Sequence, residues 1–177
     1  WGSGRRMGDG PLHEVTDEGI EATLSLNLSS MIKSNREAVR AWLDGRAGES
    51  QRGAVLNMGS VLGASPSPRY FSTHVYAAAK SAVIGFTKSC AAYYADRNIL
   101  FNVIAPALVE TPMAQRAAND DTIQAYIKTK QPLDGGRIGQ PEDLDAGAVF
   151  LLSEQSKFIT GQVLTVDGGW SVSEGQA

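Results

Sequence analysis

Tyr76 and Lys80 are the two side chains whose types and spacing best fit proton-transfer chemistry. The alanine-rich segment around them predicts a helix, and residues four positions apart on a helix leave the same face about one turn apart. A tyrosine phenol has a reference pKa of about 10, and a nearby ammonium group lowers this pKa by favouring the phenolate. Such a tyrosine could act as a general acid or base. On spacing alone, an ordinary pair on a helix surface is the simpler explanation.

Ser60 is the third candidate, because it follows a short apolar run at residues 54–58 that has a glycine on each side. The length and the flanks of this run predict a buried strand. In parallel sheets, ligands bind beyond the carboxyl ends of the strands, where a serine hydroxyl could hydrogen-bond a substrate carbonyl or hydroxyl. The alternative is a turn serine that satisfies its own backbone. Ser60 gains a functional interpretation only from Tyr76, which follows later in the chain.

Helices and strands alternate in the pattern of hydrophobic residues. Apolar residues recur at helical spacing from Thr16 to Leu43, with Thr16 as the N-cap, and again from Tyr76 to Tyr94. Short apolar runs predict strands at residues 54–58, 99–105 and 163–166. Residues 111–130 have only a weak helical periodicity, and Pro141 begins a further predicted helix. Strands that alternate with helices predict an α/β fold, in which helices cover both faces of a parallel sheet.

The composition excludes several classes of partner. The 177 residues are 42% hydrophobic, which is typical of a globular domain, and the formal net charge is −3. This charge, with scattered lysines and arginines, argues against a nucleic-acid partner. No apolar run reaches the roughly 20 residues that span a bilayer, so we expect no membrane segment. The single cysteine, Cys90, predicts a buried thiol and fits a reducing compartment. We therefore expect a cytoplasmic protein, and we predict no metal site.

Several short motifs follow one another in a fixed order. They are Leu26-Asn27-Leu28, Ser60, Tyr76-Ala-Ala-Ala-Lys80, Asn102-Val-Ile-Ala-Pro106, and Thr160-Gly161-Gln162 through Asp167-Gly168-Gly169. Each motif is weak alone, but together, from about residue 9 to residue 170, they resemble the short-chain dehydrogenase/reductase family. The resemblance implies a Rossmann-like, doubly wound parallel sheet and an enzyme that uses NAD or NADP.

The resemblance also implies roles for four residues. Tyr76 would be the general acid or base that exchanges a proton with the substrate oxygen, and Ser60 would hold that oxygen. Lys80 would bind the nicotinamide ribose and lower the pKa of Tyr76. Asn27 would hold a water molecule that links Lys80 to solvent, although an asparagine in a helix is otherwise unremarkable.

The segment after the strand at residues 99–105 is expected to approach the nicotinamide. Pro106, Val109 and Thr111 match the family's loop at the nicotinamide carboxamide, and the alternative is a simple turn that ends the strand. Residues 111–130 would form a mobile lid over the substrate. The family usually has glycine after the proline, whereas this chain has Ala107. We expect the additional methyl group to be tolerated.

The parts of the family that hold the adenine end of the nucleotide have no counterpart in this sequence. A Gly-rich turn between a strand and a helix is missing, and Gly8 and Gly10 cannot replace it because no strand precedes them. We therefore expect a single, N-terminally incomplete Rossmann-like domain over residues 1–177, with residues 1–11 as an irregular lead-in. The missing selector leaves the choice between NAD and NADP open.

Two functions fit these expectations. The first is an NAD(P)-dependent oxidoreductase that interconverts a secondary alcohol and a ketone, with a small-molecule alcohol or carbonyl compound as its substrate. The alternative is a truncated, non-catalytic remnant that serves as an oligomerisation or binding module. In either case the resemblance implies a homodimer or homotetramer, because the helices at residues 16–43 and 76–94 correspond to the family's common dimer interface.

Overall fold

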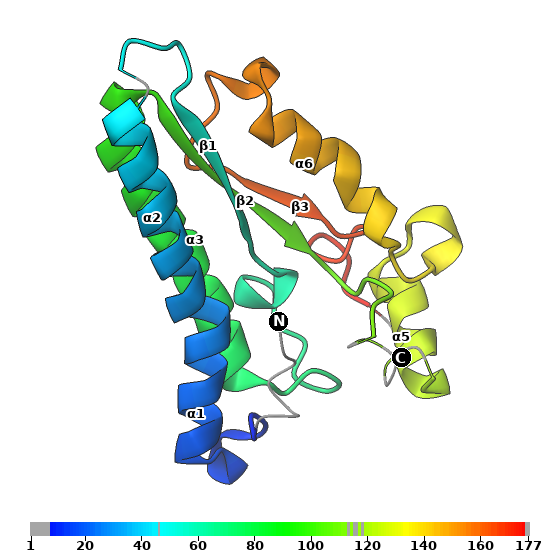
Figure 1. Cartoon of the computed structure of the whole chain (residues 1–177). Helices are drawn as coiled ribbons and strands as arrows, with labels where there is room; N and C mark the ends of the chain where they lie inside the picture. The colour runs from blue at the N-terminus through cyan, green and yellow to red at the C-terminus, as the bar shows by residue number, and fades with distance from the viewer. Residues whose placement is uncertain (1–7, 46, 113, 115–116, 118, 176–177) are drawn as a thin grey trace.

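The computed structural model describes residues 8–45, 47–112, 114, 117 and 119–175. Its central sheet has three parallel strands in the order β1-β2-β3 (Figure 1). The strands are β1 (Gly53–Met58), β2 (Ile99–Pro106) and β3 (Val163–Val166). All three predicted strands are confirmed, with bounds that agree to within one residue. Because the strands are parallel, their carboxyl ends, and the loops that follow them, lie at one edge of the sheet.

Helices cover both faces of the sheet, which confirms the predicted α/β fold. On one face lie α1 (Asp17–Leu24), a π-helical turn at Ser25–Ser29, α2 (Ser30–Gly45) and α3 (His74–Tyr94). α2 contacts β1, and α3 contacts both β1 and β2. α6 (Asp145–Leu152) contacts β1 and β2 from the other face (Figure 1).

β2 is the central strand, and its residues from Ile99 to Ala105 are all buried. Ile99 and Phe101 pack with Val39 of α2, and Val103 packs with Val83 of α3. Burying one such side chain contributes about 1.5–3 kcal/mol. The mostly apolar sequence of β2, in which Asn102 is the polar residue, is therefore explained by burial on both faces of the sheet.

A separate apolar cluster lies beyond the carboxyl ends of the strands. It joins Ile123 and Ile127 of α5 (Asp121–Lys130) to Val61 and to Trp170, which follows β3. Asp120 caps α5 by accepting hydrogen bonds from the backbone N–H groups of Thr122 and Ile123 at 3.0 and 3.1 Å. The second half of the expected lid is thus a capped helix that packs against the body of the domain.

Three sequence expectations need refinement. The first long helix contains a π-helical turn at Ser25–Ser29, which inserts an extra residue per turn and shifts the apolar face. The helix expected from Pro141 begins as a 3₁₀ turn, Pro141–Leu144, and becomes α-helical only in α6. The lead-in is irregular at residues 8–11, but it continues into a 3₁₀ turn at Leu12–Glu14, and residues 1–7 lie outside the described residues.

Among the described residues, no helix combines the length and the apolar character that crossing a bilayer requires.

Candidate active site

Ser60 lies directly beyond the carboxyl end of β1. It is the N-cap of a 3₁₀ turn, Val61–Gly63, and its Oγ accepts a hydrogen bond from the backbone N–H of Leu62 at 3.2 Å. The side chain is buried and lies close to the phenol of Tyr76, whose pKa it acts to lower. The hydroxyl of Ser60 therefore caps a turn, as the simpler interpretation expects, and its contact with a substrate oxygen stays a prediction.

Tyr76 occupies the first turn of α3, and its phenol is directed at Ser60. Burial raises the pKa of this phenol above its usual value, and the hydrogen bond from Ser60 offsets only part of the increase. The phenol is therefore protonated at neutral pH, and it is held where it can donate a proton.

Lys80 is buried one turn further along α3, on the same face as Tyr76. Its Nζ donates a hydrogen bond to the carbonyl oxygen of Met58 at 2.9 Å and lies 5.4 Å from the centre of the Tyr76 ring. Burial lowers the pKa of Lys80 from 10.5 to about 8. The expected lowering of the Tyr76 pKa by Lys80 is not found, because the ammonium group faces the Met58 carbonyl and burial dominates at the phenol.

Gly63 allows the turn after Ser60 to lie directly against α3. A β-carbon at this position would come within 2.9 Å of the Lys80 carbonyl carbon and 3.0 Å of the Ser81 nitrogen. The Gly63 carbonyl oxygen also accepts a hydrogen bond from the Ser81 hydroxyl at 2.5 Å. This close backbone approach fixes the distance between the Ser60 turn and the helix that carries Tyr76 and Lys80.

Asn27 lies in the π-helical turn, which packs against α3. Its side chain is buried, and its Nδ2 donates a hydrogen bond to the Thr23 carbonyl oxygen at 3.0 Å. Its Oδ1 is buried and has no hydrogen-bond partner among the described residues. Single π-helical turns occur frequently at functional sites. A buried acceptor without a partner is costly, so Asn27 has the chemistry to bind a polar group or a water molecule.

Pro106, Val109 and Thr111 lie at the same edge of the sheet as Ser60. Pro106 is the last residue of β2 and pairs with Val166 of β3. Val109 forms a parallel bridge with Gly139, and Thr111 lies in a bend. The segment that follows Pro106 is therefore held by an isolated bridge outside the sheet, and its approach to the nicotinamide stays a prediction.

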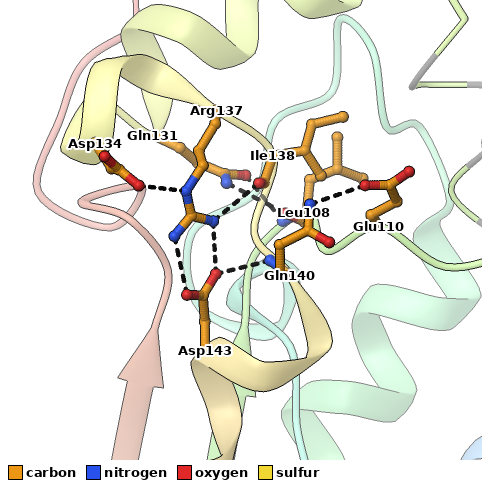
Figure 2. Close-up of polar contacts among 8 residues, drawn as sticks. All are labelled: Leu108, Glu110, Gln131, Asp134, Arg137, Ile138, Gln140 and Asp143. Atoms are coloured by element: carbon orange, nitrogen blue, oxygen red, sulfur yellow. Dashed lines mark hydrogen bonds and ion pairs between the residues drawn. The ribbon is translucent and has the colours of Figure 1, made fainter.

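Gln131, at the C-terminus of α5, holds this loop from the other side (Figure 2). Its Oε1 accepts a hydrogen bond from the Leu108 N–H at 2.9 Å, and its Nε2 donates one to the Leu108 carbonyl oxygen at 3.2 Å. Gln131 is almost fully buried, at 2% exposure. No local motif in the sequence marks Gln131, because the groups that it binds are backbone groups distant in the chain.

Arg137 fixes the segment that pairs with the loop. Figure 2 shows its guanidinium between two carboxylates, with bonds to Asp143 at 2.7 and 2.9 Å and to Asp134 at 2.5 Å. Hydrogen bonding from Arg137 lowers the pKa of Asp143 from 3.8 to about 2. Gln140, which lies in the segment that Arg137 fixes, donates a side-chain hydrogen bond to Glu110 of the loop at 2.8 Å.

The structure thus places Tyr76 and Lys80 on one face of α3, with Ser60 close to the Tyr76 phenol. Asn27 lies on a turn that packs against α3, and the loop of Pro106, Val109 and Thr111 lies at the same edge of the sheet as Ser60. Within the described part of the chain, no three His, Cys, Asp or Glu side chains come together as a metal site would require.

Comparison with known proteins shows the family of the chain. Residues 2–171 match the family described as enoyl-(acyl carrier protein) reductase. The 3-oxoacyl-[acyl-carrier-protein] reductase FabG of Chlamydia trachomatis is 35% identical over 161 residues, which cover 91% of this chain and 60% of that protein. The chain belongs to the short-chain dehydrogenase/reductase family and has its Rossmann-like fold. It spans about 60% of the length of the curated relatives it matches.

Solved structures agree with this assignment. A 4-hydroxyisoleucine dehydrogenase complexed with NADH superposes with a TM-score of 0.83 at 28% identity, covering 93% of this chain and 64% of that one. A gluconate 5-dehydrogenase from Burkholderia cenocepacia, in complex with NADP and tartrate, gives a TM-score of 0.83 at 29% identity, covering 92% and 60%. These similar proteins therefore include one bound to NADH and one bound to NADP.

Proposed function

We propose that this chain carries the catalytic part of an NAD(P)-dependent oxidoreductase that interconverts a secondary alcohol and a ketone. The observation that carries the proposal is the buried Lys80 ammonium 5.4 Å from the centre of the Tyr76 ring on one face of α3. Ser60, which acts to lower the pKa of the Tyr76 phenol, lies beside this pair. Such a set of groups is suited to polarising a carbonyl oxygen and giving it a proton.

In the reducing direction, the carbonyl carbon gains a hydride and the carbonyl oxygen gains the phenolic proton of Tyr76. Ser60 donates a hydrogen bond to the same oxygen and stabilises the negative charge that develops there. In the oxidising direction, the tyrosine takes the hydroxyl proton. The raised pKa of Tyr76 keeps the phenol protonated at neutral pH, which suits the reducing direction.

The residues present fit the nicotinamide end of a dinucleotide. Lys80 is a buried donor that would hold the ribose hydroxyls, and Asn27 offers a buried acceptor without a partner for a water molecule beside it. Pro106, Val109 and Thr111 would contact the carboxamide. When bound, the nucleotide supplies or accepts the hydride. Whether it is NAD or NADP is not decided by these residues.

The partners follow from the same assignment. A small alcohol or carbonyl compound is the substrate, and the protein is a cytoplasmic homodimer or homotetramer. A groove of about 310 Å³ between α2 and α3, lined by Val39, Leu43, Phe86, Cys90 and Tyr94 among others, supports association through these helices. The same surface would serve the alternative function, a non-catalytic oligomerisation or binding module.

A direct assay separates the two functions. The purified chain is mixed with NADH or NADPH and a panel of ketones, and nucleotide oxidation is followed, with nucleotide binding measured in parallel. We expect ketone-dependent oxidation of at least one nucleotide, and Ser60→Ala should lower kcat by about 10²-fold, as the loss of one donor to a developing oxyanion does. A chain that neither oxidises nor binds nucleotide at millimolar concentration would be the non-catalytic module.

A further inference from the structure

The start of α3, which carries Tyr76, is capped by a distant residue. The N-cap residue Thr73 makes no side-chain hydrogen bond to the helix. Instead, Asp9 accepts hydrogen bonds from the backbone N–H groups of Val75, to Oδ1 at 3.1 Å, and of Tyr76, to Oδ2 at 2.8 Å. Asp9 is buried, at 3% exposure. One carboxylate therefore satisfies two of the free N–H groups at the start of the helix with charge-assisted hydrogen bonds.

The backbone around Asp9 is itself fixed in place. Gly8 has φ of +87°, a conformation that favours glycine, and a β-carbon there would lie 3.0 Å from the hydroxyl oxygen of Thr16. That hydroxyl caps α1 by accepting a hydrogen bond from the Gly19 N–H at 3.0 Å. α1 and α3 contact each other, and Figure 1 shows that both begin at the same end of the helical layer. Asp9 therefore binds the start of α3 from a segment whose preceding residue, Gly8, lies close to the N-cap of α1.

We propose that Asp9 is a positioning residue for Tyr76, and this inference rests on the proposed function above. One of the two N–H groups that Asp9 binds belongs to Tyr76, so the carboxylate fixes the backbone from which the phenol reaches Ser60. The negative charge also favours the helical conformation at this end, where the first turn of a helix otherwise frays. Without Asp9, Tyr76 keeps its chemistry but loses its fixed place relative to Ser60.

The experiment compares Asp9→Ala and Asp9→Asn with Asp120→Ala. Asp120 is the control, because it also accepts hydrogen bonds from two backbone N–H groups at the start of a helix, both at Oδ1, and that helix is α5. Thermal stability, amide hydrogen exchange at Val75 and Tyr76, and kcat and KM for nucleotide and ketone are measured for each variant in the full chain, at a temperature where all are folded.

We expect Asp9→Ala to increase amide exchange at Tyr76 at least about tenfold and to lower kcat about 10- to 100-fold, with KM for nucleotide within about threefold of the unsubstituted chain. Asp9→Asn keeps one acceptor oxygen in place. Its increase in amide exchange at Tyr76 and its decrease in kcat should therefore both be smaller than those of Asp9→Ala. Asp120→Ala should lower thermal stability but leave amide exchange at Tyr76 unchanged.

The inference is overturned if Asp9→Ala and Asp120→Ala lower thermal stability alike while kcat and the exchange at Tyr76 stay unchanged. It is also overturned if Asp9→Asn is as impaired as Asp9→Ala in both readouts. If the unsubstituted chain shows no turnover, the proposed function fails, and amide exchange at Tyr76 still decides whether Asp9 fixes this residue.

Discussion

Burial favours the uncharged form of both titrating groups in the site. It raises the pKa of the Tyr76 phenol and lowers that of the Lys80 ammonium to about 8, so the two shifts have opposite signs. At neutral pH the phenol is protonated, while Lys80 is still mostly charged. At neutral pH the site therefore contains a phenol that can donate a proton and, beside it, a lysine side chain that carries a positive charge.

The free energy of unfolding should therefore rise with pH as Lys80 loses its proton. The Lys80 pKa is about 8 in the folded chain against 10.5 for an ordinary lysine, so between these values the unfolded chain binds more protons and stability increases with pH. The slope can reach ~1.4 kcal/mol per pH unit. Above about pH 10 the raised pKa of Tyr76 acts in the opposite direction, because the unfolded phenol ionises first.

Lys80→Met isolates this effect, since it keeps the length of the side chain and removes the charge. Denaturant unfolding of both chains across this pH range, taken as a difference, cancels contributions that they share, such as that of Cys90. The unsubstituted chain should gain stability relative to the variant from pH 8 upward. Parallel pH profiles would show that Lys80 is not desolvated.

At the scale of elements, the loop after β2 is held between two segments that follow it in the chain. Gln131 pairs with both backbone groups of Leu108, and the backbone of Gly139 pairs with Leu108 and Glu110 at 3.0 and 2.7 Å. The loop is thus preorganised by the end of α5 and by the segment that Arg137 fixes. Preorganisation of this kind lowers the cost of binding a ligand.

Gln131→Glu should destabilise the chain in a pH-dependent way. Below about pH 4 the introduced carboxyl group is protonated and can still donate to the Leu108 carbonyl, so stability stays near that of the unsubstituted chain. Burial raises its folded pKa, so the destabilisation begins above about pH 4 and grows with pH until the folded group ionises. Nucleotide affinity should also fall at neutral pH.

Gln155→Glu is the matched control, because Gln155 is exposed. Its unfolding free energy should follow that of the unsubstituted chain across the pH range, as surface substitutions usually do. If Gln131→Glu and Gln155→Glu gave the same pH profile, the side chain of Gln131 would not hold the loop.

At the scale of the whole molecule, the sequence predicts most of the fold because burial imposes a regular pattern. β2 is buried on both faces and has a mostly apolar sequence, and the buried residues of α3 recur at helical spacing. Ser60, Tyr76 and Lys80 could be grouped because each lies in a recognisable motif. We still predict that residues 1–177 form a single partial domain.

Other features could not be predicted, because they depend on contacts between distant segments. The π-helical turn at Asn27 breaks the helical period that a sequence pattern assumes. Asp9 lies in a glycine-rich lead-in without periodicity, and its partners are backbone groups of α3. The expected lowering of the Tyr76 pKa is not found, because the spacing predicts that Lys80 lies near Tyr76 but does not predict that burial of the phenol outweighs a nearby charge.

The most direct test of the proton-transfer role is the kinetics of Tyr76→Phe beside Tyr93→Phe, an exposed tyrosine on the same helix. Removing the phenolic hydroxyl at Tyr76 should lower kcat by about 10²- to 10⁴-fold, the usual contribution of a general acid or base. The dissociation constant for nucleotide should stay within about threefold, which is less than 1 kcal/mol, and Tyr93→Phe should behave as the unsubstituted chain. Undiminished turnover in Tyr76→Phe would contradict the account.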